Sequence, residues 1–285
     1  MAHPPAPLDT TTEFGRLQAG WYVRMLWRLT VMSAFPTRWR KRLRKVLARR
    51  WPGPFDVTVE GVNMRVYPAE NRDDRVLLGL GRLPEADEHA LIRPFVGPGK
   101  MFVDIGANIG TYSLWVAPTV APGTRVVAFE PHPRTFGKLA FNLQANGAGN
   151  VVARNLAIAA EAGSMNLFSD GGGNIGHASL LREGAGAVRS IETVGVAPLG
   201  QALADLGIAR IELLKIDVEG FEDRALMPLF DHAPETLWPK AILIETVLSH
   251  HWERDCLAEL AAKGYHRQAA TSENVLMVRG RAGKH

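Results

Sequence analysis

The chain has 285 residues, of which 46% are hydrophobic and 22% are charged, and this is enough apolar sequence to bury a sizeable core. Its one cysteine, Cys256, excludes a disulfide framework within the chain and a cysteine-rich zinc site. One cysteine suits a cytoplasmic location, and no apolar run approaches the roughly 20 residues that cross a bilayer.

The first residues, 1–13 (MAHPPAPLDTTTE), lack the basic start and apolar core of a secretory signal. Their Pro and Thr content predicts a disordered tail. Residues 14–50 follow with eleven Lys and Arg and no Asp or Glu, whereas the remainder of the chain carries 22 basic and 29 acidic residues. Apolar residues recur there at helical spacing, so we expect 14–54 to be a basic amphipathic helical segment, broken near Pro36.

Four partners stay open for this basic segment, of which contact with nucleic-acid phosphates is the least favoured. Tryptophans interspersed among the cations favour peripheral contact with an anionic membrane, at its inner face. The alternatives are packing on the acidic remainder of the same chain and a contact in a homodimer. A nucleic-acid surface over the whole protein is not expected, because the remainder is mildly acidic.

Between the basic segment and the core, residues 55–100 form a separate stretch. FDVTVEGVNMRVY (residues 55–67) alternates in polarity around a glycine and predicts a β-hairpin. Residues 85–96 then predict a helix that ends at the sequence GPG.

From residue 101 to residue 285 the pattern changes to short apolar strands alternating with helices. The predicted strands are 101–105, 125–130, 150–155, 211–217, 241–245, 265–268 and 275–278, and the predicted helices are 111–120, 134–146, 253–263 and one from residue 221. This alternation predicts an α/β fold, with a mostly parallel sheet covered on both faces. The Gly-rich residues 171–186 follow a strand-like stretch, SMNLFSD (residues 164–170), and predict a mobile loop.

The string FVDIGANIG (residues 102–110) predicts a cofactor site. It places Asp104 near the end of a strand, and a tight turn follows before a helix; the turn comprises Gly106, Ala107, Asn108 and Gly110. Glycines let a ligand approach the backbone closely, and a helix N-terminus offers free amides. Asp104 is placed to attract a cationic amino-acid portion of a ligand.

The next predicted strand ends in Glu130, 26 residues after Asp104. A carboxylate at that position can accept hydrogen bonds from both hydroxyls of a ribose. The pair therefore fits an adenosine ligand, which leaves S-adenosylmethionine (SAM) and NAD as candidates. The turn GANIG is not the G-x-G-x-x-G that supports a pyrophosphate, and this favours SAM.

With these residues, the chain resembles the FkbM family of SAM-dependent methyltransferases. The matching segments, in the family's order, are FVDIGANIGTYSLWVA, VVAFEPHPRTFGKLAFNLQANG, NLAIAAEAGSMNLF, LLKIDVEGFEDRAL and AILIE. The resemblance implies a class I Rossmann-like fold with a seven-stranded sheet, and methyl transfer mostly to hydroxyl oxygens. It also implies cofactor contacts from Pro131, His132, Ala157 and Asp217.

The string KIDVEG predicts the catalytic centre. In an extended chain Lys215, Asp217 and Glu219 share one face. Methyl transfer requires alignment of the acceptor oxygen and removal of its proton, which a carboxylate can accept. For each residue a second role stays open: Lys215 pairs with an acid, Asp217 positions the amino-acid portion of SAM, and Glu219 caps the following helix.

Two further candidates follow the next strand. Glu245 ends that strand and is expected in the site, because an unpaired buried carboxylate is costly. His250 or His251 is an alternative base, although a solvated loop is the other interpretation of the pair. Asp217, Glu219 and Glu245 offer hard oxygen ligands, but no spacing demands a metal, and none is expected.

These patterns predict a SAM-dependent methyltransferase, with O-methylation of a hydroxyl on a sugar, glycolipid or other small natural product. Two alternatives stay open: a nicotinamide-dependent oxidoreductase on the same kind of fold, and a non-catalytic, membrane-associated SAM-binding module.

Overall fold

The computed structural model describes residues 6–116, 123–169, 178–182, 188 and 190–280. Its centre is a seven-stranded sheet whose order is β11-β12-β10-β9-β3-β4-β5. The strands are β11 (Tyr265–Ala270), β12 (Asn274–Arg279), β10 (Ala241–Glu245), β9 (Leu213–Ile216), β3 (Met101–Ile105), β4 (Arg125–Phe129) and β5 (Val151–Arg154). Only β12 runs antiparallel to its neighbours. The predicted α/β class, with a mostly parallel sheet of seven strands, is confirmed.

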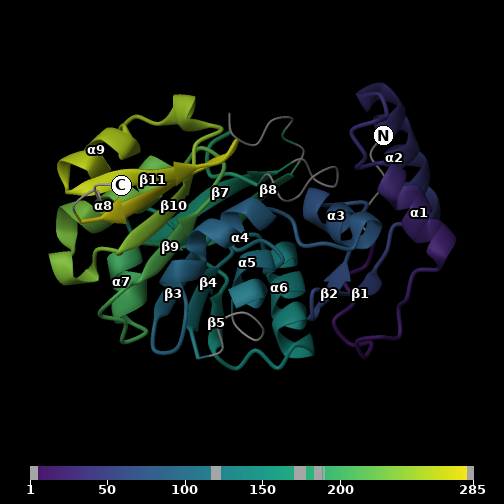
Figure 1. The fold of residues 1–285 in the computed structure, drawn as a ribbon, viewed down its shortest axis with the longest axis horizontal. Coiled ribbons are helices and arrows are strands. Elements are labelled where there is room, and N and C mark those ends of the chain that lie inside the picture. The colour runs from purple at the N-terminus through teal and green to yellow at the C-terminus, as the bar shows by residue number, and fades with distance from the viewer. Residues whose placement is uncertain (1–5, 117–122, 170–177, 183–187, 189, 281–285) are drawn as a thin grey trace.

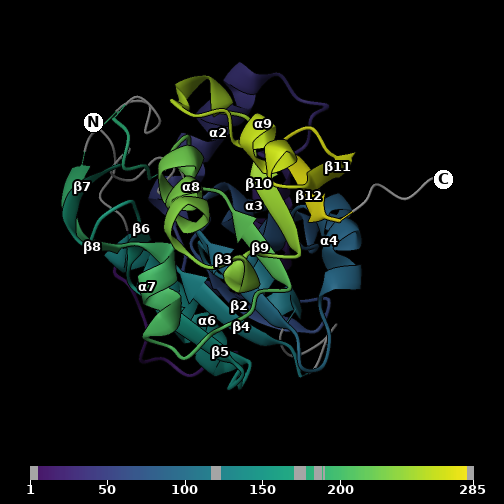
Figure 2. The same ribbon diagram turned by 90° about the vertical axis from the view of Figure 1, so that its left-hand side faces the viewer.

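Helices cover both faces of this sheet because its strands alternate their buried side chains between the two faces. Phe102 and Leu213 belong to one buried cluster, with side chains of α4 (Ala86–Ile92), α5 (Thr111–Leu114) and α6 (Pro133–Ala145). Val103 and Leu214 belong to the other, with α7 (Leu199–Ala204), α8 (Glu222–His232) and α9 (Cys256–Ala262). Figure 2 shows the sheet between α4 on one side and α7 and α8 on the other.

Several elements differ from the sequence prediction. The helix expected over 85–96 is α4 followed by the 3-10 turn η1 (Arg93–Phe95), since Pro94 cannot donate the next helical hydrogen bond. The helix expected over 111–120 is α5, and 117–120 lie outside the described residues. Most of the predicted loop at 171–186 lies outside them as well. Further 3-10 turns are η4 (Glu235–Leu237) and η5 (Ser249–His251).

A small second sheet, absent from the prediction apart from a strand-like stretch near residue 165, lies beside the core. It has the order β6-β8-β7, from β6 (Ala157–Ile158), β8 (Ser190–Ala197) and β7 (Gly163–Ser169). Its apolar side chains Leu167, Val194 and Val196 join the cluster under α7 and α8. The strand β8 alternates in burial over eight residues, so its pattern was present in the sequence and was missed.

The N-terminal residues form a unit that packs beside α6, at the end of the molecule remote from β11 and α9 (Figure 1). It contains α1 (Trp21–Leu29), α2 (Thr37–Arg50), the hairpin β1 (Phe55–Val59) and β2 (Val62–Val66), and α3 (Arg72–Leu80). The predicted break near Pro36 and the predicted hairpin are confirmed. The helix α3 was not predicted. It packs on α1 at Gly79, where a Cβ would lie 2.8 Å from the Arg28 Cα.

Residues 6–13 are ordered against this unit, which differs from the prediction of a disordered tail. Arg65 is almost fully buried, and its guanidinium donates to the carbonyls of Asp9, Thr12 and Glu13 while it pairs with Asp56. A buried guanidinium has five donors to satisfy, and the tail supplies three acceptors. The composition of the tail could not reveal this partner, because Arg65 is more than fifty residues away.

Among the helices that the structure describes, none is long and apolar enough to span a membrane.

Candidate active site

A cavity opens at the carboxyl ends of the central strands, where parallel α/β sheets bind ligands. Residues from β3, β4, the small second sheet and the segment after β9 enclose it. Its lining comprises Ile105, Gly106, Asn108, Phe129, Glu130, Pro131, Thr135, Leu156, Ala157, Ile158, Leu167, Ala178, Leu180, Asp217, Val218, Glu219 and Phe221. Residues expected to bind the cofactor and residues expected to catalyse thus line one space.

The turn after β3 has the backbone geometry that its glycines permit. Gly106 has φ +75°, and a Cβ there would lie 1.9 Å from the Asp217 carbonyl oxygen, so no larger residue fits. Gly110 has φ +94°, and a Cβ would meet Leu139 at 2.7 Å. Gly110 and Ala107 are not among the lining residues. They shape the turn, whereas Gly106 and Asn108 face the cavity.

Glu130 is buried at the end of β4, with both carboxylate oxygens held by backbone amides. Its Oε2 accepts from the Asn108 N–H and its Oε1 from the His132 N–H, each at 2.9 Å. Burial raises the pKa of Glu130 to about 7, and the two amides oppose this shift. Because each carboxylate oxygen has a second lone pair, both can still accept a hydroxyl. Pro131 and Ala157 line the cavity beside it.

His132 is placed differently from the other expected cofactor residues. Its Nδ1 caps α6 by accepting the Thr135 N–H, and its Nε2 lies 3.5 Å from Glu192. Burial lowers the pKa of this imidazole, and Glu192 opposes the shift. The imidazole ring therefore caps α6, and the backbone amide of His132 binds Glu130.

Asp104 lies beneath the cavity rather than in its wall. It is fully buried, and its Oδ2 accepts a hydrogen bond from the Ser113 hydroxyl at 2.6 Å. Its Oδ1 has no hydrogen-bond partner and lies 4.0 Å from the Lys215 Nζ. Burial raises the pKa of Asp104, and Lys215 opposes this shift. An unpaired buried carboxylate oxygen is costly, so this atom is a candidate for contact with a cationic ligand, directly or through water.

Lys215 contacts both the turn after β3 and the segment after β9. Its Nζ donates to the Gly106 carbonyl at 3.1 Å and pairs with the Asp217 Oδ2 at 3.4 Å. Although burial opposes it, the charges of Asp217 and Asp104 hold the pKa of Lys215 above its usual range. The predicted pairing of Lys215 with an acid is confirmed. Asp217 remains partly solvated, with its side chain 33% exposed.

Glu219 does not share an extended face with Lys215 and Asp217. The strand β9 ends at Ile216, and Glu219 takes a left-handed conformation with φ +56°. It lines the cavity, and its carbonyl accepts the Ser179 hydroxyl. The helix α8 begins at Glu222 with Phe221 at its N-cap, and Glu222 accepts the amides of Val218 and Gly220 in the turn before the helix. The turn at the EG dipeptide, which the extended-chain assumption ignored, explains the difference at Glu219.

Glu245 joins the acidic side of this centre. Its Oε2 is buried and has no hydrogen-bond partner. Burial, followed by the charges of Asp217 and Glu219, raises the pKa of Glu245 to about 10. This shift favours the neutral carboxyl, and Glu245 is not among the residues that line the cavity. Neither histidine lines the cavity: His251 lies against Gly220, and His250 is exposed.

The N-terminal unit contributes polar groups that the sequence did not reveal. Asn108 accepts from the Asn71 Nδ2 at 2.8 Å through its Oδ1, and its Nδ2 donates to Asp73 at 3.2 Å. Burial and the neighbouring Asp74 raise the pKa of Asp73 to about 6. Burial and Asp73 raise that of Glu85 to about 8, which Lys215 opposes. These residues precede the GANIG turn by more than twenty positions, so only tertiary packing brings them to it.

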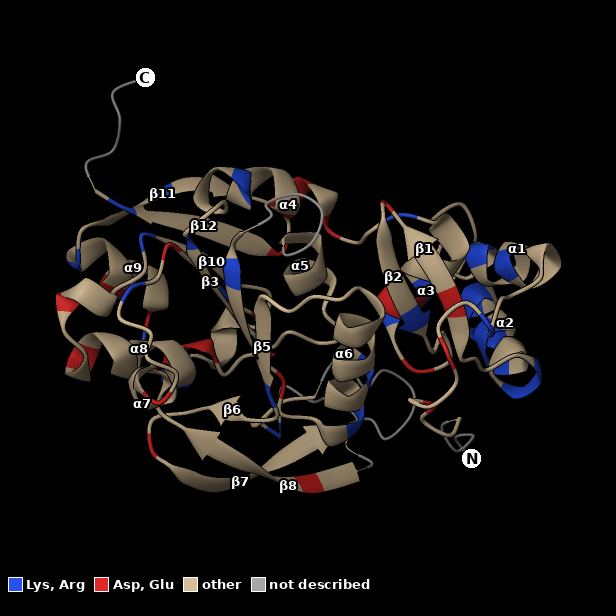
Figure 3. Cartoon of the chain, turned by 90° about the horizontal axis from the view of Figure 1, so that it is seen from below, with Lys and Arg blue, Asp and Glu red and all other residues tan. Residues whose placement is uncertain are grey.

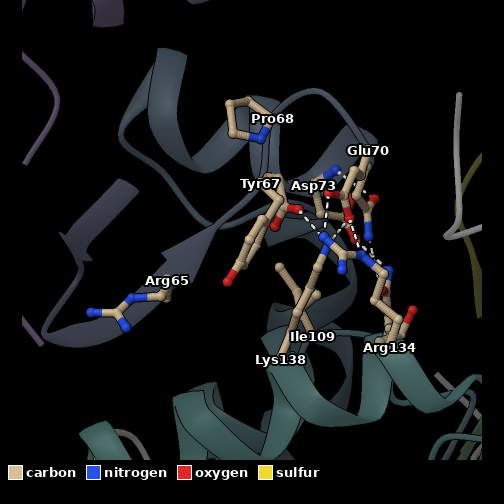
Figure 4. A network of polar contacts seen from close by, with 12 residues as sticks. Arg65, Tyr67, Pro68, Glu70, Asp73, Ile109, Arg134 and Lys138 are labelled. Carbon is tan, nitrogen blue, oxygen red and sulfur yellow. Dashed lines mark hydrogen bonds and ion pairs between the residues drawn. The ribbon is translucent and has the colours of Figure 1, made fainter. Parts of the chain in front are cut away.

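A buried ion cluster joins the segment that carries these polar groups to α6 (Figure 4). Glu70 is 1% exposed and binds both Arg134, at 2.7 Å, and Lys138, at 2.9 Å. Asp74 lies 3.4 Å from the same Lys138 Nζ. Arg134 and Lys138 are on α6, so the cluster joins the segment before α3 to the helix that follows Glu130.

In the part of the chain that the structure describes, no group of three or more His, Cys, Asp or Glu could hold a metal ion.

Comparisons with known proteins agree with this geometry. The family model described as "Methyltransferase FkbM domain" matches residues 104–265. The chain is 32% identical over 193 residues to 31-O-demethyl-FK506 methyltransferase FkbM of Streptomyces tacrolimicus, covering 58% of this chain and 70% of that protein. It is also 32% identical over 197 residues to AMB antimetabolite synthetase AmbE of Pseudomonas aeruginosa, covering 55% of this chain but only 9% of the synthetase.

A solved structure titled methyltransferase FkbM from Methylobacillus flagellatus KT is also similar. It is 18% identical, covers 63% of this chain and 43% of that one, and superposes with a TM-score of 0.40.

Proposed function

The chain belongs to the FkbM methyltransferase family, and on that premise we propose that it transfers a methyl group from SAM to a hydroxyl oxygen of a sugar, glycolipid or other polar natural product. One observation carries the proposal: a single cavity is lined by Glu130 on one side and by Asp217 and Glu219 on the other. Family membership favours this function over the nicotinamide-dependent oxidoreductase, for which the turn also lacks the pyrophosphate fingerprint.

The residues present fit SAM as the methyl donor. The second lone pairs of the Glu130 oxygens suit two ribose hydroxyls. Asp104, whose Oδ1 accepts no hydrogen bond, lies beneath the cavity, where its charge suits the ammonium of the amino-acid portion. The apolar wall suits an adenine ring; it comprises Ile105, Phe129, Leu156, Ile158, Leu167 and Leu180. When bound, SAM supplies an electrophilic methyl group on a sulfonium.

In this proposal Asp217 is the general base. It is the carboxylate that lines the cavity, lies beside Lys215 and still reaches solvent. As the acceptor oxygen bonds to the methyl carbon, its proton passes to an Asp217 carboxylate oxygen, and the sulfur keeps the electron pair of the broken bond. Glu245 does not line this cavity, but its raised pKa favours the neutral carboxyl and so limits the negative charge beside Asp217.

Two observations support a hydroxyl-bearing acceptor. The Streptomyces relative is named for 31-O-demethyl-FK506, an oxygen acceptor. In addition, an open groove between α3, α4 and the β11–β12 turn has a polar, charged lining that suits a hydroxyl-rich molecule. This lining includes Arg72, Arg82, Glu85, Glu88, Thr271 and Glu273. Glu85 connects the groove to the centre, since its pKa responds to the charges of Lys215 and Asp217.

Binding and transfer test this proposal separately. Isothermal titration should detect SAM and its demethylated product, and Glu130→Ala should weaken both together, because both carry the same ribose. Incubation with methyl-labelled SAM and host extract, separated into lipid, glycan and small-molecule fractions, should then place the label in an ether-linked methyl group. Tight NADH binding without SAM binding would overturn the proposal, and label in an amine would reassign the acceptor atom.

A further inference from the structure

The outer end of the N-terminal unit is strongly basic, and no acidic residue in the described part of the chain pairs with its cations. Ten cations lie on α1 and α2, two on the first helix and eight on the second. None of them forms an ion pair with an acidic residue that the structure describes. Figure 3 shows them on α1 and α2, beyond the hairpin and away from the acidic residues of the core. Ion pairs with the described acidic residues are therefore not what holds this segment.

Apolar packing holds the two helices instead. Trp27 is fully buried, and Val23 and Leu47 are 3% and 2% exposed. The Trp27 indole also donates to the Trp51 carbonyl. The inner faces of α1 and α2 are consequently occupied, and the outward face is fixed in position before any partner arrives.

The outward face carries large apolar side chains among the cations. On α2, Trp39 is 40% exposed and Val46 is 60% exposed. They lie seven residues apart, two helical turns on the same face, with Arg42 between them. On α1, Trp21 is 77% exposed and Met25 is 47% exposed, and these two residues lie one helical turn apart. An exposed tryptophan beside cations suits a boundary with one apolar and one polar side.

We propose that the outward face of α1 and α2 binds the surface of a membrane that contains anionic phospholipids. The cations approach the lipid phosphates, and Trp21, Trp39 and Val46 enter the headgroup region. Neither helix is long or apolar enough to span the bilayer, so each lies along it. The site at the carboxyl edge of the sheet then works beside the membrane, on an acceptor within reach of that surface.

Two other partners explain less of this face. A nucleic acid needs the cations but leaves Val46 and Met25 exposed without a function. A symmetric dimer through this face would set each copy's cations against those of the other. An anionic bilayer accounts for both the charge and the apolar side chains, and this argument does not depend on the proposed catalytic function.

Co-flotation of the full chain with vesicles tests the proposal. Vesicles of phosphatidylcholine with 30% phosphatidylglycerol should carry the protein at low salt, whereas phosphatidylcholine alone should not, and salt should reverse the binding. The variant R42Q/K45Q/R49Q should lower the partition coefficient by about a hundredfold, since each cation contributes roughly fivefold. W39S/V46S should also weaken binding. The matched control R93Q/R125Q/R267Q removes three exposed cations of the remainder and should float like the wild type.

Unchanged SAM affinity and thermal unfolding in every variant would show that the fold and the cofactor site are intact. Failure to float at low salt would overturn the proposal, as would equal losses in the α2 variant and its control. Equally tight binding to a DNA duplex, insensitive to W39S/V46S, would replace the membrane by a polyanion. Vesicle-independent dimers that the α2 variant abolishes would replace it by a second copy of the chain.

Discussion

The central sheet and the N-terminal unit are stabilised in different ways. Strands such as β3 and β9 are buried on both faces and carry their polar groups at their ends, where Lys215 and Asp217 lie. In the N-terminal unit, polar groups are buried inside, with Arg65 on Asp56 and Glu70 on Arg134 and Lys138. Both arrangements join residues that are distant in sequence, 109 positions for Lys215 and Gly106 and 68 for Glu70 and Lys138.

This difference matters because the two regions meet at Asn108. Its backbone amide donates to Glu130 in the core, and its side chain is held by Asn71 and Asp73 of the N-terminal unit. The N-terminal unit is therefore part of the cofactor site as well as a platform for the basic helices. Four predictions test how far each region controls binding, chemistry and stability.

The largest effect is expected at the catalytic edge. Asp217→Asn should lower kcat by about 10²–10⁴-fold, because the amide cannot accept the acceptor's proton. SAM affinity should change little, since the ribose and the adenine are held elsewhere. Steady-state kinetics and titration with SAM measure the two effects, with the exposed Asp205→Asn as the control. Full activity in Asp217→Asn would remove this residue from the mechanism.

The buried ion cluster should dominate stability in the N-terminal unit. Glu70→Gln leaves Arg134 and Lys138 without their shared counter-charge, and removing one partner of a buried pair costs about 3–5 kcal/mol of unfolding free energy. The matched control is Glu235→Gln, which breaks an ion pair with Arg279 whose acid is 70% exposed. That change should cost less than about 1 kcal/mol. Denaturant unfolding measures both, and equal costs would show that burial does not set the strength of the cluster.

Part of the site could be predicted from the sequence, and part could not. Asp104, the GANIG turn and Glu130 could be found because strand, turn and acid are contiguous in sequence. The geometry of Glu219 could not, because the KIDVEG string was treated as extended while its EG turn is left-handed. Asn71 and Asp73 gave no signal, because α3 has no clear apolar period and its contacts with Asn108 form only in the folded protein. Glu85 was expected at the start of a helix, but nothing in the sequence indicated that it lies near Lys215. The ordered tail depends in the same way on the distant Arg65.

The state of Glu130 should make cofactor affinity depend on pH. Its pKa of about 7 lies above the usual value of an acid, so the carboxyl is neutral below pH 7 and ionised above it. An ionised carboxylate accepts ribose hydroxyls better, so affinity should fall as the pH falls. From the ionised fraction, SAM should bind about tenfold more weakly at pH 6 than at pH 8. Adenosine, which lacks the amino acid, should show the same trend, and a similar trend in Glu130→Gln would assign it to another group.

The smallest effect separates two roles of Asn71. Its Oδ1 accepts the Asp73 N–H and caps α3, and its Nδ2 donates to Asn108. Asn71→Ser keeps an oxygen for the cap but loses the amide Nδ2 that donates to Asn108, whereas Asn71→Ala loses both groups. We expect Asn71→Ser to unfold like the wild type and to bind SAM about fivefold more weakly, as the loss of one hydrogen bond predicts. Asn71→Ala should show the same weakening and lose about 1 kcal/mol of stability in addition. Because the serine variant leaves the helix capped, its SAM affinity reports on the position of Asn108 alone. An affinity equal to that of the wild type would make Asn71 a helix cap without influence on the cofactor turn.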